Sequence, residues 1–254
     1  MNISQQEIQK LGVTFLGCGN INAPIWFIGM EPGACESCLS LEENARIRIS
    51  SFGEKIGLSE AHHLLKEDNQ KLSQVWLFAS KIVRSITKVS DWDDTIKAKE
   101  FAHTKFGIVN GITLAVELLP LPRSDMKIWP EIYKELFPNY ETYKEIILKE
   151  RLEFLRKKIS IHKPKFIFAY GKGNYNDYHK LSDTKTKWIN LSNLLNDHLL
   201  GRNLSFVAVG ISDKTIYVLL PFLGNGWISK KDIEVITDYL KNSFPNKIQE
   251  ITTI

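Results

Sequence analysis

The strongest chemical signal in this sequence is one carboxylate that follows a short apolar run. Ile25 to Ile28 are all apolar, and they lead directly into Gly29-Met30-Glu31-Pro32-Gly33. The run is typical of a buried strand, which must end here because proline lacks a backbone donor and glycine permits unusual dihedral angles. Open α/β sheets bind ligands at the carboxyl ends of their strands. Glu31 is therefore a candidate catalytic residue at the edge of a crevice; the alternative is an ordinary turn with an exposed glutamate.

The three cysteines offer little further chemistry. Cys35 and Cys38 have the C-x-x-C spacing of metal and redox sites, but the sequence contains no second pair for a four-thiolate site. A small, odd number of cysteines is typical of a reducing compartment, and no secretory signal is visible at the N-terminus. We therefore expect a cytoplasmic protein with no metal and no cofactor.

Composition limits the class of protein without naming its function. The 254 residues are 43% hydrophobic and 24% charged, which is ordinary for a globular protein, and no apolar stretch reaches membrane-spanning length. A net charge of +4 permits a polyanionic partner but does not require one. No repeat or linker divides the chain, so we expect a single domain over 1–254.

Hydrophobic patterns predict the elements that must position Glu31. Apolar residues recur at helical spacing over 41–57, 72–88, 140–160 and 229–242, whereas strand-like runs occupy 106–119, 165–171, 204–210 and 215–220. Strands separated by helices long enough for crossovers predict a three-layer α/β/α fold with a mostly parallel central sheet. We expect the Glu31 turn, the stretch after Asn110 and the loop from Pro221 to Trp227 to meet at one end of that sheet.

Three blocks of the sequence, taken together, resemble the uracil-DNA glycosylase superfamily. They are Gly29–Gly33, Phe106–Leu114 (FGIVNGITL) and Lys163–Gly171 (KPKFIFAYG), in matching order and spacing, and the Pro221–Trp227 loop completes the set. The resemblance implies a uracil-DNA glycosylase-like fold and a monofunctional DNA glycosylase. Such an enzyme flips a base out of DNA, hydrolyses the N-glycosidic bond without metal or cofactor, and leaves an abasic site. We expect it to act on DNA as a monomer, away from membranes.

The resemblance also assigns roles to individual residues. Glu31 stands where the family has Asp or Asn, and would orient the attacking water and stabilise the positive charge that grows on the sugar. An oxocarbenium-like transition state independently favours a fixed carboxylate. Asn110 matches the family's base-reading asparagine, whose amide suits the edge of a flipped pyrimidine. The alternative for Asn110 is an asparagine that satisfies backbone groups at a strand end.

Gly33 bears on which base is removed. The uracil-specific branch carries a tyrosine here that blocks substituents at C5 of the pyrimidine, and glycine removes that barrier. The chain accordingly most resembles bacterial anti-phage glycosylases that remove α-glucosyl-hydroxymethylcytosine, which implies modified phage DNA as the partner. Gly33 also occurs in mismatch-type relatives, where it serves only the turn.

The last loop departs from the family pattern. Many members carry a histidine or asparagine before a Pro-Ser pair, but this loop reads PFLGNGW and has no histidine. The group that stabilises the departing base is therefore not identified, although Asn225 is a candidate. Trp227 or Leu223 could fill the space left by the flipped nucleotide, or Trp227 could simply anchor the loop.

The full set of predicted site residues follows from these considerations. The candidate catalytic residue is Glu31, and the predicted substrate-binding residues are Asn110, Gly29, Met30, Pro32, Gly33, Phe222 and Asn225. The predicted DNA-binding residues are Arg123, Ser124, Lys172, Trp227, Lys230 and Lys231. Three alternatives stay open: a uracil or mismatch repair glycosylase, a catalytically silent nucleic-acid-binding module, and a hydrolase of free nucleotides.

Overall fold

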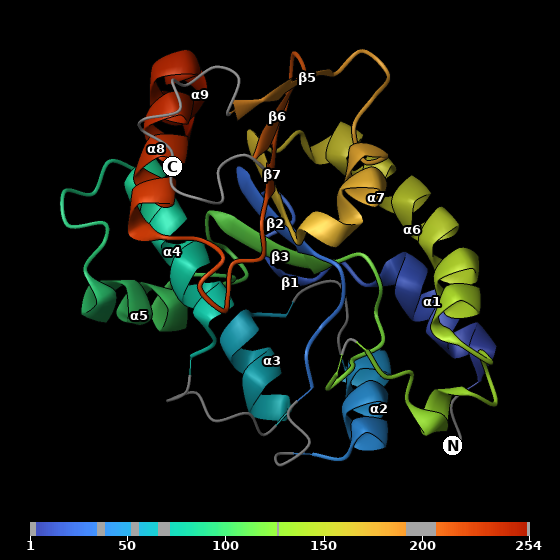
Figure 1. The fold of residues 1–254 in the computed structure, drawn as a ribbon. Coiled ribbons are helices and arrows are strands. Elements are labelled where there is room, and N and C mark those ends of the chain that lie inside the picture. The colour runs from blue at the N-terminus through green and yellow to red at the C-terminus, as the bar shows by residue number, and fades with distance from the viewer. Residues whose placement is uncertain are drawn as a thin grey trace.

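The protein is built around one seven-stranded mixed sheet (Figure 1). The computed structural model describes residues 4–34, 39–51, 56–65, 72–125, 127–191 and 207–252. The strands are β1 (Cys18–Gly19), β2 (Ile25–Gly29), β3 (Thr113–Glu117), β4 (Phe166–Tyr170), β5 (Lys187–Asn190), β6 (Ala208–Ile211) and β7 (Ile216–Leu220), in the spatial order β1-β3-β2-β4-β7-β6-β5.

The centre of the sheet is parallel. Strands β3, β2, β4 and β7 run in one direction, whereas β1, β5 and β6 pair antiparallel to their neighbours. Gly29 at the end of β2 pairs with Glu117 at the end of β3. We call the side on which these four parallel strands terminate the carboxyl end of the sheet, and the side on which they begin the amino end.

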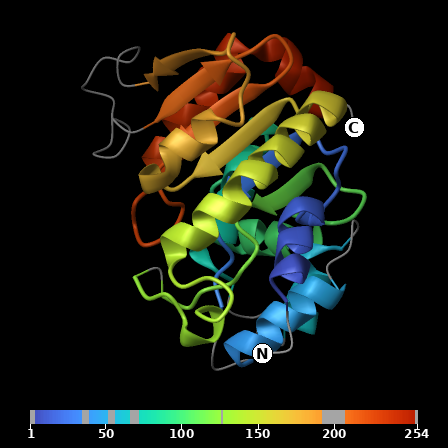
Figure 2. The same cartoon turned by 90° about the vertical axis from the view of Figure 1, so that its right-hand side faces the viewer.

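Helices cover both faces of the sheet. They are α1 (Gln5–Thr14), α2 (Leu41–Ser51), α3 (Leu58–Leu64), α4 (Gln74–Ile86), α5 (Thr95–Thr104), α6 (Tyr140–His162), α7 (Tyr175–His179), α8 (Lys230–Ser243) and α9 (Pro245–Thr252), with short 3₁₀ turns η1 (Glu131–Tyr133) and η2 (Lys172–Asn174). In Figure 1, α4, α5, α8 and α9 lie on one side of the sheet and α1, α6 and α7 on the other, and Figure 2 looks onto α1 and α6. This arrangement is the α/β architecture with a mostly parallel centre that the sequence predicts.

Two hydrophobic cores follow from the alternation of side chains along each strand. In β2, Ile25 and Phe27 belong to the core beneath α4 and α8, whereas Trp26 and Ile28 belong to the core beneath α1 and α6. Successive side chains of a strand point to opposite faces, so a strand covered on both faces reads as a continuous apolar run. That is why the run before Glu31 predicts a central strand.

The helix predictions agree better with the structure than the strand predictions. The helices expected at 72–88, 140–160 and 229–242 are confirmed as α4, α6 and α8, and Ser229 caps α8 through a reciprocal capping box with Asp232. The strand expected over 106–119 is wrong for its first half: β3 begins only at Thr113, after a turn in which Gly107 has a φ of 65°. Part of the stretch expected at 204–210 lies outside the described residues, and β6 begins at Ala208.

Within the described part of the chain, every helix is too short or too polar to cross a bilayer.

Candidate functional site

The Glu31 turn leaves the carboxyl end of the sheet, as the sequence predicts. After β2 ends at Gly29, the chain stays paired with the segment that follows β3: the amide of Leu118 donates to Gly29 O at 2.9 Å and that of Leu119 to Met30 O at 2.7 Å. The carboxylate itself differs from the expectation of an open crevice, because the Glu31 side chain is 0% exposed. This side chain contacts Arg123, in the segment after β3, and the Tyr140 phenol at the start of α6.

Arg123 holds the Glu31 carboxylate. Its Nη2 lies 2.5 Å from Glu31 Oε2 and its Nε donates to the same oxygen at 2.7 Å. The Arg123 side chain is only 3% exposed, and its guanidinium lies 4.1 Å from the centre of the Tyr140 ring. Arg123 is a predicted DNA-binding residue, but here its guanidinium is buried against Glu31, where a buried carboxylate needs a cation beside it; contact with DNA stays a prediction.

Burial and the ion pair act on Glu31 in opposite directions. Burial raises the pKa of Glu31, and the Arg123 guanidinium only partly offsets this effect. The Tyr140 phenol also favours the ionised form, although Oε1 has no hydrogen bond of ordinary geometry to any described residue. Glu31 is thus a buried carboxylate with Oε2 held by Arg123 and Oε1 sealed from solvent.

A second carboxyl group, Glu117, lies beside this pair and is not among the predicted site residues. Glu117 is the last residue of β3, directly opposite Gly29, and is half-buried, with its Oε2 sealed from solvent. Burial raises the pKa of Glu117 to about 8; the positive charge of Arg48 opposes that rise and the negative charge of Glu31 adds to it. The only signal in the sequence is a charged residue that interrupts the apolar run TLAVELL.

Gly29 makes room for the Glu117 carboxyl group. A Cβ atom on Gly29 would lie 2.2 Å from Glu117 Oε2 and 2.6 Å from the Tyr170 hydroxyl. These distances are below any real contact, so the two polar groups occupy the space that a side chain would need. Glycine is required here for close approach rather than for an unusual backbone angle.

Two more buried arginines surround the end of β3. Arg151 on α6 donates to the carbonyl oxygens of Glu117 at 2.9 Å and Phe15 at 2.5 Å. Arg48 on α2 donates to Asn44 Oδ1 at 2.8 Å and acts electrostatically on Glu117. The described part of the site therefore combines two carboxyl groups with three buried arginines.

Asn110 lies at the other end of the sheet. It is exposed in the turn before β3, where Thr113 pairs with Ile25 at the start of β2. The five residues of β3 separate it from Glu31 by roughly 16 Å, at about 3.3 Å per residue. The prediction that Asn110 shares a rim with Glu31 is wrong, because the strand starts after Asn110 rather than ending near it.

The loop after β7 does reach the carboxyl end of the sheet, as predicted. Phe222 is 39% exposed with its ring centre 6.4 Å from that of Tyr170, and Trp227 is 50% exposed. Asn225 has a φ of 55° and its backbone amide donates to Gln74 Oε1 at 2.8 Å. Leu223 is fully buried, so Trp227 and Phe222 are the apolar side chains that this loop presents to a partner.

The remaining predicted site residues include both buried and solvent-exposed ones. Met30 and Pro32 are buried, and Gly33 is exposed, with no atom within 4 Å of the position that a Cβ would take. Lys172 is exposed just beyond β4, and Ser124 is exposed next to Arg123. Lys230 forms an ion pair with Asp93, and Lys231 with Glu234 at 3.2 Å. Both of these lysines remain more than half exposed.

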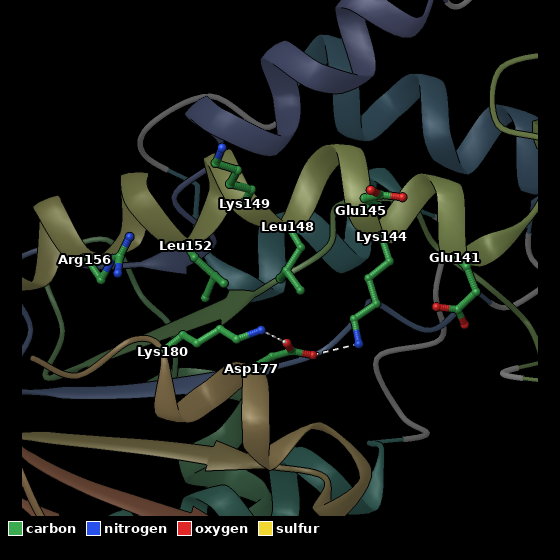
Figure 3. A pocket seen from close by; sticks show the side chains of 9 residues that line it. All are labelled: Glu141, Lys144, Glu145, Leu148, Lys149, Leu152, Arg156, Asp177 and Lys180. Atoms are coloured by element: carbon green, nitrogen blue, oxygen red, sulfur yellow. Dashed lines mark hydrogen bonds and ion pairs between the residues drawn. The ribbon is translucent and has the colours of Figure 1, made fainter. Parts of the chain in front are cut away.

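A separate groove of about 500 Å³ runs between α6 and α7 (Figure 3). At its centre Asp177 binds two lysines, Lys144 at 2.7 Å and Lys180 at 2.9 Å. Other lining residues include Leu148 and Arg156. None of the predicted site residues lines this groove, and the mixed charges along it largely neutralise each other.

Among the residues that the structure describes, no cluster of three or more His, Cys, Asp or Glu side chains could hold a metal ion. Cys35 and Cys38 lie outside the described residues.

Comparison with known proteins adds no assignment: no protein-family model matches the chain, and no curated protein matches it.

Proposed function

We propose that this chain is a monofunctional DNA glycosylase that hydrolyses the N-glycosidic bond of a flipped, modified pyrimidine and leaves an abasic site. One observation carries the proposal: Glu31 and Glu117 lie together at the ends of adjacent central strands, one bound by Arg123 and the other with a pKa of about 8. Pairs of carboxyl groups in unlike environments are the usual catalysts in enzymes that cleave O-glycosidic bonds, and cleavage of an N-glycosidic bond likewise builds positive charge on the sugar.

Glu31 has the role of stabilising the cationic sugar. Bond cleavage builds positive charge at the anomeric carbon, and a fixed carboxylate lowers the energy of that state most effectively in a water-poor site. The uncommitted oxygen, Oε1, would face the sugar or orient the attacking water. Because the side chain has no exposed surface, Arg123 and the other groups packed against it must move when DNA binds.

The proposed base is α-glucosyl-hydroxymethylcytosine. Gly33 supports a bulky C5 substituent, since a side-chain atom added there would meet nothing within 4 Å. The exposed rings of Phe222 and Trp227, with Lys230 and Lys231 nearby in sequence and Lys172 exposed just beyond β4, suit an extruded nucleotide and its flanking phosphates. No strand cleavage is expected, because no lysine is assigned as a covalent nucleophile.

A second candidate is a nucleic-acid-binding module without catalysis. The complete enclosure of Glu31 by Arg123 favours it, because a buried ion pair can be purely structural. The two candidates differ in one observable, the release of free base.

A panel of DNA duplexes and single strands tests the proposal directly. The panel carries uracil, ethenocytosine, hydroxymethylcytosine and its α- and β-glucosylated forms, and is scored for abasic sites and for free base by mass spectrometry. We expect release of the α-glucosylated base and an intact backbone until alkali is added. Preferred release of uracil or ethenocytosine would indicate a repair glycosylase, and binding without any release would favour the silent module.

A variant pair links that activity to the site. Glu31→Gln keeps the size of the side chain and removes its charge, so we expect DNA binding to persist and base release to fall by roughly 10³-fold. Glu131→Gln is the matched control, because Glu131 is 83% exposed and its ion pair with Lys134 lies on the surface. Equal turnover by wild type and Glu31→Gln would remove Glu31 from the mechanism.

A further inference from the structure

Glu117 ends β3 with a carboxyl oxygen to which no described residue makes a hydrogen bond of ordinary geometry. This oxygen, Oε2, is buried, although the residue as a whole keeps some exposed surface. An ionised carboxylate oxygen without good partners is costly to bury, whereas a protonated carboxyl group is much less so. The geometry alone therefore favours a neutral Glu117 that has a proton to donate.

The Glu117 side chain points across the end of β2. Glu117 Oε2 and the Tyr170 hydroxyl converge above Gly29, two residues before Glu31 in the chain. The ring of Tyr170 in turn faces Phe222 on the exposed loop after β7. Glu117 thus has the charge of Glu31 acting on it and lies near Tyr170, whose ring is a neighbour of the exposed Phe222.

The surroundings of Glu117 combine opposing charges. Burial is the largest influence and raises its pKa to about 8, with Glu31 acting in the same direction; Arg48, Arg151 and the Tyr170 hydroxyl act against it. A group with this pKa is mostly protonated at neutral pH and can still lose its proton readily. The charged and titratable groups that act on it come from several elements: Arg48 of α2, Glu31 after β2, Arg151 of α6, Tyr170 of β4 and Tyr178 of α7.

We infer that Glu117 is the general acid that protonates the departing base. This inference rests on the proposed glycosylase function, and it supplies the leaving-group donor that the histidine-free loop after β7 lacks. Cytosine-type bases leave poorly as anions, so a proton delivered as the bond breaks lowers the barrier.

The step balances as a hydrolysis. The bond between the anomeric carbon and the base nitrogen breaks, and its electron pair goes to the base, which takes the proton of Glu117. Water adds its oxygen to the anomeric carbon and loses a proton to Glu31 and then to solvent. Glu117 regains its proton from solvent, so the enzyme returns to its starting state.

Single-turnover base release across pH 6–9 tests the assignment, using whichever DNA of the panel the wild type processes. We expect the wild-type rate to fall above about pH 8, as Glu117 loses its proton. Glu117→Gln should be slower by roughly 10²–10⁴-fold at neutral pH and should lack this alkaline decline. Glu117→Asp should keep a decline, because it retains an acid, and Glu131→Gln should match the wild type.

Each outcome of this experiment supports or overturns the role of Glu117 as general acid. Release by the wild type with an equal rate and pH profile for Glu117→Gln would overturn the assignment and leave the glycosylase function standing. No release by the wild type from any DNA would overturn both. If Glu117→Gln does not fold, as judged by circular dichroism, the wild-type and Glu117→Asp profiles still decide, since the absence of an alkaline decline in both would overturn the role.

Discussion

The two ends of the central sheet are built from different chemistry. At the carboxyl end, the buried pair of Glu31 and Arg123 lies near the half-buried Glu117, where the segments after β2 and β3 continue to pair. At the amino end, the turn before β3 presents an exposed Asn110, and its Gly111 carbonyl accepts a hydrogen bond from Asn20 at 2.8 Å. Buried charge thus lies just beyond the ends of β2 and β3, and an exposed turn without charged side chains at Asn110 and Gly111 lies where β3 begins.

The largest effect should come from removing the cation at the carboxyl end. Arg123→Met leaves Glu31 buried without its partner, so the free energy of unfolding should fall by about 3–5 kcal/mol in urea titrations. Lys134→Met is the matched control, because its exposed pair with Glu131 should contribute about 0–1 kcal/mol. A loss as small as that of the control would mean that the carboxyl end holds no costly buried charge.

The free energy of unfolding should depend on pH, and part of that dependence should come from Glu117. The folded chain holds a proton on Glu117 up to about pH 8, whereas a glutamate in the unfolded chain loses it near its ordinary value of 4.5. The contribution of Glu117 to the free energy of unfolding is therefore full below pH 4.5. It is lost as pH rises toward 8, at roughly 1 kcal/mol per pH unit.

Urea unfolding at pH 5, 6, 7 and 8 measures this slope. Glu117→Gln should remove the Glu117 part of it, because the amide does not titrate. Identical slopes for the wild type and the variant would show that the Glu117 carboxyl titrates normally.

Two glycines at the carboxyl end should respond differently to the same substitution. Gly29→Ala puts a methyl group against Glu117 and Tyr170, so we expect a loss of about 1–3 kcal/mol in the free energy of unfolding. Gly33→Ala meets open space and should change it by no more than about 0.5 kcal/mol. Thermal and urea unfolding of both variants checks this contrast, and equal losses would contradict the close packing over Gly29.

The smallest effect should come from the amino end. Asn110→Ala should leave base release within about twofold of the wild type, because the side chain is exposed and lies a full strand length from Glu31. The measurement is the same single-turnover assay of base release. A loss of tenfold or more would bring the amino end into the substrate site and erase the distinction between the two ends.

Particular residues show where prediction from the sequence ends. The position of Glu31 after a strand is predictable because Pro32 and the neighbouring glycines are local signals, and the Ser229 cap of α8 is equally local. The position of Asn110 is not, because an apolar stretch does not reveal where within it a strand begins. That Glu117 belongs to the site is not predictable, because one charged residue in an apolar run does not indicate which residues lie next to it in the folded sheet.

The amino-acid sequence by itself determined the α/β class, the strand before Glu31 and the major helices, because hydrophobic periodicity, proline and capping residues act over short distances. Only the tertiary structure decided which charges became neighbours: Arg123 reaches Glu31 across 92 residues of chain, and Glu117 reaches Tyr170 through strand pairing. Burial and the pKa of a carboxyl group depend on neighbours in space, and those neighbours exist only once the sheet has formed.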